Sequence, residues 1–135
     1  MSMMSVEMQS LFCAILLGLV QLLLAVMAGV GARGMPWAAG PRDEPGAALG
    51  KIAGRLDRAF RNFLETFAFF AAAVLLAHAL DKSTHNSVLG AEIYLWARVL
   101  YVPAYVIAIP FLRTLIWLAS FIGILMVLSA IWPGM

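Results

Sequence analysis

Apolar residues dominate four long segments of the chain, and shorter polar stretches separate them. The segments are Leu11–Val30, Phe63–Leu80, Ala91–Ile109 and Phe111–Trp132. Each comes close to the roughly 20 residues that an α-helix needs to cross about 30 Å of hydrocarbon. None shows the period-two alternation of a β-strand that crosses a membrane. The pattern therefore predicts an all-α integral membrane protein, a four-helix bundle formed by a single domain over residues 1–135.

The composition supports a membrane protein and excludes several other classes. The chain has 135 residues, of which 64% are hydrophobic and 12% charged, and its mean hydropathy is +0.95. A soluble domain of this length needs more polar surface to cover its core. The net charge of +2 is too small to favour a nucleic-acid partner. With one cysteine, Cys13, and two histidines that lack ligand spacing, we expect no metal site and no disulfide within the chain.

Basic residues gather between the first and second apolar segments and predict the orientation of the chain. This connection, residues 31–62, contains Arg33, Arg42, Lys51, Arg55, Arg58 and Arg61. The second connection contributes only Lys82. Because cytoplasmic loops carry an excess of lysine and arginine, we expect the first loop in the cytoplasm and both termini outside. Within this loop, apolar residues recur at helical spacing from Leu49 onward, so the second helix is expected to begin there, before it enters the membrane.

Three of the segments also carry polar side chains at helical spacing. They are Arg58, Arg61, Asn62 and Glu65 around the second segment, Arg98, Tyr101 and Tyr105 on the third, and Arg113 and Trp117 on the fourth. Within each group the spacing places the side chains on one face of a helix. In the predicted orientation the three groups converge in the cytoplasmic half of the bilayer, and Arg98 lies nearest the middle of the bilayer. Tyr94 and Trp96, toward the other end, are expected to lie at the membrane interface.

A carboxylate near several arginines in a membrane segment has two explanations. A charged side chain at the bilayer centre costs at least ~2.5–3.5 kcal/mol, so such groups rarely face lipid. In the first explanation, Glu65 pairs with one arginine and holds the bundle together, while the other basic residues anchor to headgroups. In the second, the surplus of positive charge around Glu65 forms a pocket for an anion that enters from the cytoplasm. The residues alone leave both explanations open.

Three short elements within these segments carry a resemblance to a known family. They are RAFRNFLET around the start of the second segment, ARVLYVPAY on the third and PFLRTLIW at the start of the fourth. They resemble the MAPEG family, the membrane-associated proteins in eicosanoid and glutathione metabolism. The family includes microsomal glutathione transferases, leukotriene and prostaglandin E synthases, and a lipoxygenase-activating protein. The resemblance covers roughly residues 10–132. It implies a homotrimer of the bacterial glutathione-transferase type in a bacterial inner membrane, with glutathione bound between subunits near the cytoplasmic side.

The resemblance also implies a role for each polar residue. The expected glutathione-binding residues are Arg58, Arg61, Asn62, Glu65, Arg98, Tyr101, Tyr105 and Thr114. In the family, the second-helix arginines and asparagine hold the carboxylates and backbone of glutathione, and the glutamate takes its amino group. Arg113 is expected to be catalytic, because a guanidinium near the thiol stabilises the thiolate. The implied function is a glutathione transferase or peroxidase that acts on a hydrophobic acceptor arriving through the bilayer.

Two other functions stay compatible with the sequence. The lipoxygenase-activating protein shows that the scaffold also serves as a non-enzymatic binding protein. A small multidrug exporter, in turn, has four short spans and one essential buried acid. The arginines around Glu65 disfavour the exporter, because a transporter of cations gains nothing from guanidinium groups beside its carboxylate.

Overall fold

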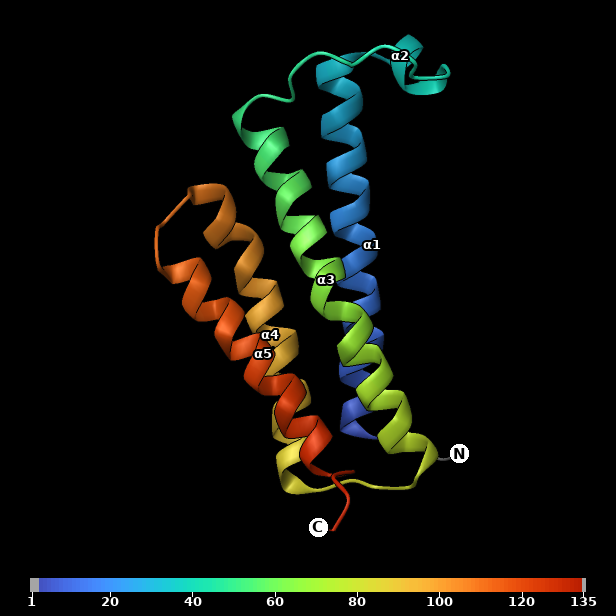
Figure 1. Cartoon of the computed structure of the whole chain (residues 1–135), viewed down its shortest axis with the longest axis vertical. Helices are drawn as coiled ribbons and strands as arrows, with labels where there is room; N and C mark the ends of the chain where they lie inside the picture. The colour runs from blue at the N-terminus through green and yellow to red at the C-terminus, as the bar shows by residue number, and fades with distance from the viewer. Residues whose placement is uncertain (1–2, 135) are drawn as a thin grey trace.

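The computed structural model describes residues 3–134, and within that range it contains five α-helices and no strand. The helices are α1 (Val6–Arg33), α2 (Met35–Ala39), α3 (Lys51–Ala79), α4 (His85–Ile107) and α5 (Leu112–Ser129). The four long helices pack along one another, and the short α2 lies at one end with the loop that leads into α3 (Figure 1). The start of α1 and the end of α5 lie at the opposite end (Figure 1). The prediction of an all-α chain is confirmed.

Three of the described helices are long and apolar enough to cross a membrane, namely α1 with 28 residues, α3 with 29 and α5 with 18. Their outer surfaces carry large apolar side chains, and Leu23, Phe69 and Leu115 are each more than 60% exposed. Apolar surface on this scale marks contact with lipid or with another protein. The helices therefore fit an integral membrane protein.

α3 extends well beyond its apolar segment. It begins at Lys51, directly after Gly50, whose φ of 79° lies in the left-handed region that favours glycine. Its first turns are polar, and the helix then continues without interruption into the apolar part. The start agrees with the one predicted near Leu49. As a result, Arg58 and Glu65 lie on one rigid element.

α4 begins at His85, well before the Ala91 that the apolar pattern predicts. The cause is a capping box. The Thr84 hydroxyl accepts a hydrogen bond from the Ser87 backbone N–H at 3.1 Å, while the Ser87 hydroxyl accepts one from the Thr84 N–H at 2.8 Å. These bonds satisfy two N–H groups that the first turn of a helix leaves unpaired. The polar residues before Ala91 therefore belong to the helix.

α4 and α5 form an antiparallel pair whose backbones touch (Figure 1). A Cβ atom on Gly90 would lie 2.6 Å from the carbonyl oxygen of Gly123, and a Cβ on Gly123 would lie 2.6 Å from that of Gly90. No larger residue fits at either position without moving a helix. Small residues at such crossings are typical of helices that pack inside membranes.

The core between α3 and α4 is aromatic. Phe70 stacks on Tyr94 with ring centroids 4.0 Å apart, and Tyr94 is fully buried. The Tyr94 hydroxyl shares a 3.0 Å hydrogen bond with Thr66. The prediction that Tyr94 lies at the membrane interface is therefore wrong. Its ring fills the core, and Thr66 satisfies its polar end.

A buried carboxylate ties the first turn of α1 to α4. Glu7 Oε1 accepts hydrogen bonds from the hydroxyl groups of Ser83 at 2.6 Å and Ser87 at 2.7 Å. Ser87 thereby takes part both in the cap of α4 and in this contact. The clasp formed by Glu7, Ser83 and Ser87 fixes the end of the molecule that lies opposite α2.

Candidate functional site

One polar cavity gathers side chains from three helices. Its volume is about 360 Å³, and we call it the arginine cavity. Its lining consists of Arg58, Arg61, Asn62 and Glu65 of α3, Tyr101 and Tyr105 of α4, and Arg113 of α5. All seven belong to the set of residues expected from the sequence. Two members of that set, Arg98 and Thr114, do not line it.

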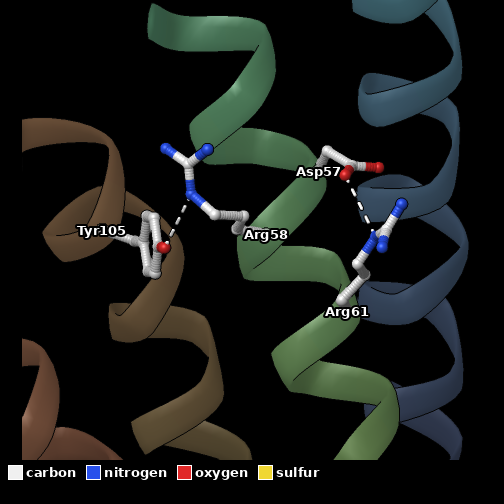
Figure 2. Close-up of polar contacts among 4 residues, drawn as sticks. All are labelled: Asp57, Arg58, Arg61 and Tyr105. Atoms are coloured by element: carbon white, nitrogen blue, oxygen red, sulfur yellow. Dashed lines mark hydrogen bonds and ion pairs between the residues drawn. The ribbon is translucent and has the colours of Figure 1, made fainter. Parts of the chain in front are cut away.

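Arg58 and Tyr105 connect α3 to α4 across the cavity. The Nε–H of Arg58 donates a 3.0 Å hydrogen bond to the hydroxyl oxygen of Tyr105, and Figure 2 shows the two side chains leaning toward each other. The oxygen of Tyr105 acts here as an acceptor. Its own hydrogen therefore stays available for a ligand in the cavity.

Arg61 lies on another side of α3 and is held by its own helix. Its Nε is 3.1 Å from Oδ2 of Asp57, one turn earlier, and Figure 2 shows this pair turned away from Arg58. The Arg61 side chain is 74% exposed. An exposed pair at this spacing stabilises a helix by only about 0.3–0.5 kcal/mol. Arg61 can therefore leave Asp57 at little cost when an anion offers a better partner.

Arg113, at the start of α5, approaches the same tyrosine. The centre of its guanidinium lies 5.0 Å from the centroid of the Tyr105 ring, and that of Arg58 lies 5.9 Å from it. Tyr101 adds a second ring, with its centroid 5.7 Å from that of Tyr105. Two cations are thus held near one phenol. Thr114, the next residue along, is exposed outside the cavity.

Glu65 differs from its predicted setting. It is exposed rather than buried, and within residues 3–134 the only ion pair joins Asp57 and Arg61. Glu65 therefore does not hold the helices together by pairing with an arginine. The cavity lining contains three guanidinium groups and this one carboxylate. Such a lining suits a ligand that carries more negative than positive charge.

Arg98 is placed behind the cavity instead of at its surface. The residue is 1% exposed, and its guanidinium lies 4.3 Å from the centroid of the Tyr101 ring. Its Nη2 donates a 2.9 Å hydrogen bond to Oδ1 of Asn62. The prediction that Arg98 faces inward holds. Arg98 does not line the cavity, whereas its partner Asn62 does. Asn62 therefore lies between Arg98 and any ligand in the cavity.

An apolar groove adjoins the arginine cavity and shares Glu65 with it. The groove lies between α3 and α5 and has a volume of about 410 Å³. Phe69 of α3 and the stacked pair Trp117 and Phe121 of α5, with ring centroids 5.6 Å apart, form much of its wall. The sequence patterns did not predict this groove, although Trp117 and Phe121 lie four residues apart and therefore share one face of α5. A charged cavity thus opens beside an apolar one.

Comparison with known proteins supports a family assignment. A family model described as "MAPEG family" matches residues 10–132, nearly the whole chain. Neither the curated proteins nor the solved structures gave a match. A match of this extent is sufficient to establish the family, and the chain belongs to the MAPEG family.

Proposed function

We propose that the protein is a membrane-bound glutathione transferase or peroxidase, which joins glutathione to a lipophilic acceptor or reduces a lipophilic peroxide. The observation that carries the proposal is the juxtaposition just described. Seven polar side chains from three helices line one cavity with an excess of positive charge, and an apolar groove adjoins it at Glu65.

The charges of the cavity are complementary to those of glutathione. The tripeptide has two carboxylates and one ammonium group, and the cavity offers three guanidinium groups and one carboxylate. Arg58 and Arg61 bind the carboxylates, since a guanidinium matches the geometry of a carboxylate with two parallel donors. Glu65, which has no basic partner within 4.0 Å among residues 3–134, binds the ammonium group. Tyr101, which is only 4% exposed, forms part of the cavity wall beside the bound tripeptide.

Arg113 stabilises the thiolate. A thiol has a pKa of about 8.5, and a neighbouring guanidinium lowers it toward neutrality. Tyr105 contributes to the same step, because its hydroxyl accepts from Arg58 and directs its own hydrogen toward the bound sulfur. The thiol proton passes to solvent water, and the negative charge that develops on the sulfur lies near Arg113. Thr114 takes no part in this step.

The acceptor binds in the groove beside Phe69 and Trp117. The thiolate sulfur attacks the electrophilic carbon of the acceptor, a sulfur–carbon bond forms, and the leaving group departs with its electron pair. With a hydroperoxide, the sulfur attacks the terminal oxygen and the O–O bond breaks, and the departing alkoxide takes up a proton from water and leaves as an alcohol. A second glutathione then displaces water from the resulting sulfenic acid and completes the disulfide. An acceptor dissolved in the bilayer reaches this groove from the lipid side.

The proposal also includes the placement of the chain in its membrane. α4 crosses the bilayer as a fourth span, held against α5 through Gly90 and Gly123. The basic connection that includes α2 lies in the cytoplasm, and both termini lie outside. The membrane is a bacterial inner membrane. The subunit forms a homotrimer, in which a neighbouring copy covers the exposed side of the arginine cavity.

A conjugation assay tests the proposal. The purified protein in detergent receives glutathione and a panel of hydrophobic electrophiles, and product is measured for wild type, Arg113→Leu and the control Arg42→Leu, whose arginine lies outside the cavity. Arg113→Leu is expected to lower kcat about 100-fold, as loss of a charge-stabilising donor does in other enzymes, with little change in glutathione affinity. The control keeps its activity. Unchanged turnover in Arg113→Leu would exclude a catalytic role for Arg113. If wild type binds glutathione but turns over none of the electrophiles, the result indicates a non-enzymatic binding protein.

A further inference from the structure

Arg98 is a buried charge without an acidic partner. It lies 1% exposed between Phe63 and Tyr101, whose ring centroids are 5.8 Å and 4.3 Å from its guanidinium. No carboxylate among residues 3–134 lies within ion-pair distance of it. Its Nε and Nη1 atoms are buried and have no hydrogen-bond partner among these residues. A charge in this setting is costly, and among the described residues Asn62 provides its one hydrogen bond.

That contact fixes the orientation of Asn62. A guanidinium carries five N–H donors and no acceptor, so the side chain that faces it must present an oxygen. The 2.9 Å bond from Arg98 Nη2 therefore binds the amide oxygen of Asn62. An asparagine amide can usually be turned by half a rotation, which exchanges its oxygen and nitrogen. Here Arg98 excludes the turned arrangement.

The consequence reaches the arginine cavity, because Asn62 belongs to its lining. With its oxygen bound by Arg98, the Asn62 amide has its two N–H donors left for the cavity. Within residues 3–134 these donors form no hydrogen bond. A bond from a charged donor also polarises the amide and strengthens its N–H groups as donors. Asn62 is thus prepared for an acceptor oxygen.

We propose that Arg98 is a positioning residue that acts through Asn62 and makes this position of the cavity select a carbonyl or carboxylate oxygen. The identity of the ligand as glutathione rests on the function proposed above, whereas the orientation of Asn62 does not. Arg98 itself does not touch the ligand. Glu65 is the one lining side chain that carries a carboxylate. We therefore expect a cationic group of the ligand to bind beside Glu65.

A double-mutant cycle on glutathione affinity tests the proposal. Affinity is measured by calorimetry for wild type, Arg98→Met, Asn62→Ala and the double variant. Each single change is expected to weaken binding about tenfold. Because Arg98 acts through Asn62, Arg98→Met should weaken binding no further in the Asn62→Ala background. Two effects that multiply would overturn the proposal.

Two further variants separate positioning from a general role in folding. In Arg98→Lys the side chain still presents only donors to Asn62, so glutathione affinity should stay within about threefold of wild type. In Arg98→Gln the side chain can present an oxygen to Asn62, so glutathione should bind as weakly as it does to Arg98→Met. Equal binding by the lysine and glutamine variants contradicts the proposal. The kinetic signature is a raised KM for glutathione with kcat unchanged, since Arg113 is intact. A fall confined to kcat contradicts it equally.

A stability cycle without ligand keeps this inference separate from the proposed function. Asn62→Asp should raise the unfolding midpoint when Arg98 is present, because it creates an arginine–carboxylate pair, and should lower it in the Arg98→Met background. The same shift in both backgrounds would show that Arg98 does not contact position 62, and would overturn the proposal. If wild type fails to bind glutathione while this cycle behaves as expected, the proposed function fails and the positioning role stands.

Discussion

The two ends of the helix bundle are built in different ways. At the end where α1 starts, the helices touch directly: Gly90 lies against Gly123, and Phe70 stacks on Tyr94. Glu7 accepts hydrogen bonds from two serine hydroxyl groups at the same end. Around the arginine cavity, Glu65 has no ion pair within residues 3–134 and two nitrogens of Arg98 have no partner. At the α1 end Oε2 of Glu7 is also buried without a partner among the described residues, but its Oε1 accepts two hydrogen bonds, whereas the buried guanidinium of Arg98 donates only one. The two ends therefore differ in packing: direct helix contacts hold the α1 end, whereas the other end contains the cavity in which we propose that a ligand binds.

The first prediction breaks the tight end. In Gly90→Leu the new side chain meets the Gly123 carbonyl and Met126, which a Cβ at position 90 would already approach to 2.6 Å and 2.5 Å. Because the clash is with the Gly123 backbone, which cannot rotate aside as a side chain can, α4 must move away from α5. We expect the free energy of unfolding to fall by about 3 kcal/mol or more, above the usual ~1–3 kcal/mol for overpacking. We expect little folded protein, as measured by gel filtration and thermal unfolding in detergent.

The matched control is Gly31→Leu on α1, where a Cβ meets nothing within 4 Å. It should fold with the midpoint of wild type. A normal midpoint in Gly90→Leu would show that the contact of α4 with α5 does not support the fold.

The second prediction weakens the clasp at the same end. Glu7→Ala removes the acceptor of the hydrogen bonds from Ser83 and Ser87. Hydrogen bonds to a charged group contribute about 1.5–3 kcal/mol each, so the two together contribute about 3–6 kcal/mol. Because the variant also removes Oε2 of Glu7, which is buried without a partner among the described residues, we expect a net loss of about 2–4 kcal/mol in the free energy of unfolding. Glutathione affinity should stay at the wild-type value, because the clasp is remote from the cavity. Reduced affinity with unchanged stability would contradict the division between the two ends.

The third and smallest effect concerns the cavity end. Asp57→Asn removes the ion pair with Arg61, and the change in stability should stay below about 0.5 kcal/mol because the pair is exposed. The released guanidinium should then raise glutathione affinity about twofold, a gain that calorimetry resolves. Asp43→Asn, in the loop between α2 and α3, is the control for the change in net charge. Weaker glutathione binding in Asp57→Asn would mean that Arg61 acts from its present position.

The helices and one face of the cavity follow from sequence patterns. Long apolar runs predict the elements, and the seven-residue span from Arg58 to Glu65 places both on one side of α3. The start of α4 was predicted too late, because an apolar count ignores a capping box between Thr84 and Ser87. Local hydrogen bonding extends a helix into polar sequence that hydropathy assigns to a loop.

Contacts between distant segments could not be predicted in the same way. The depth at which Tyr94 and Arg98 lie depends on the packing of α3 against α4, and a single sequence does not specify it. The clasp joins Glu7 to serines more than 70 residues away, and neither partner carries a recognisable motif. Likewise, the sequence gives no sign that Arg98 donates a hydrogen bond to Asn62, the contact from which we propose an indirect role for Arg98.

A calorimetric titration with glutathione, on wild type and Glu65→Gln in the same detergent, tests the central claim most directly. The account predicts saturable binding to wild type and binding about tenfold weaker to Glu65→Gln, since the ammonium group loses its charged partner. The unfolding midpoints of the two proteins should agree, because Glu65 forms no ion pair within the described chain. No saturable binding to wild type, or equal affinity in both proteins, would contradict the account.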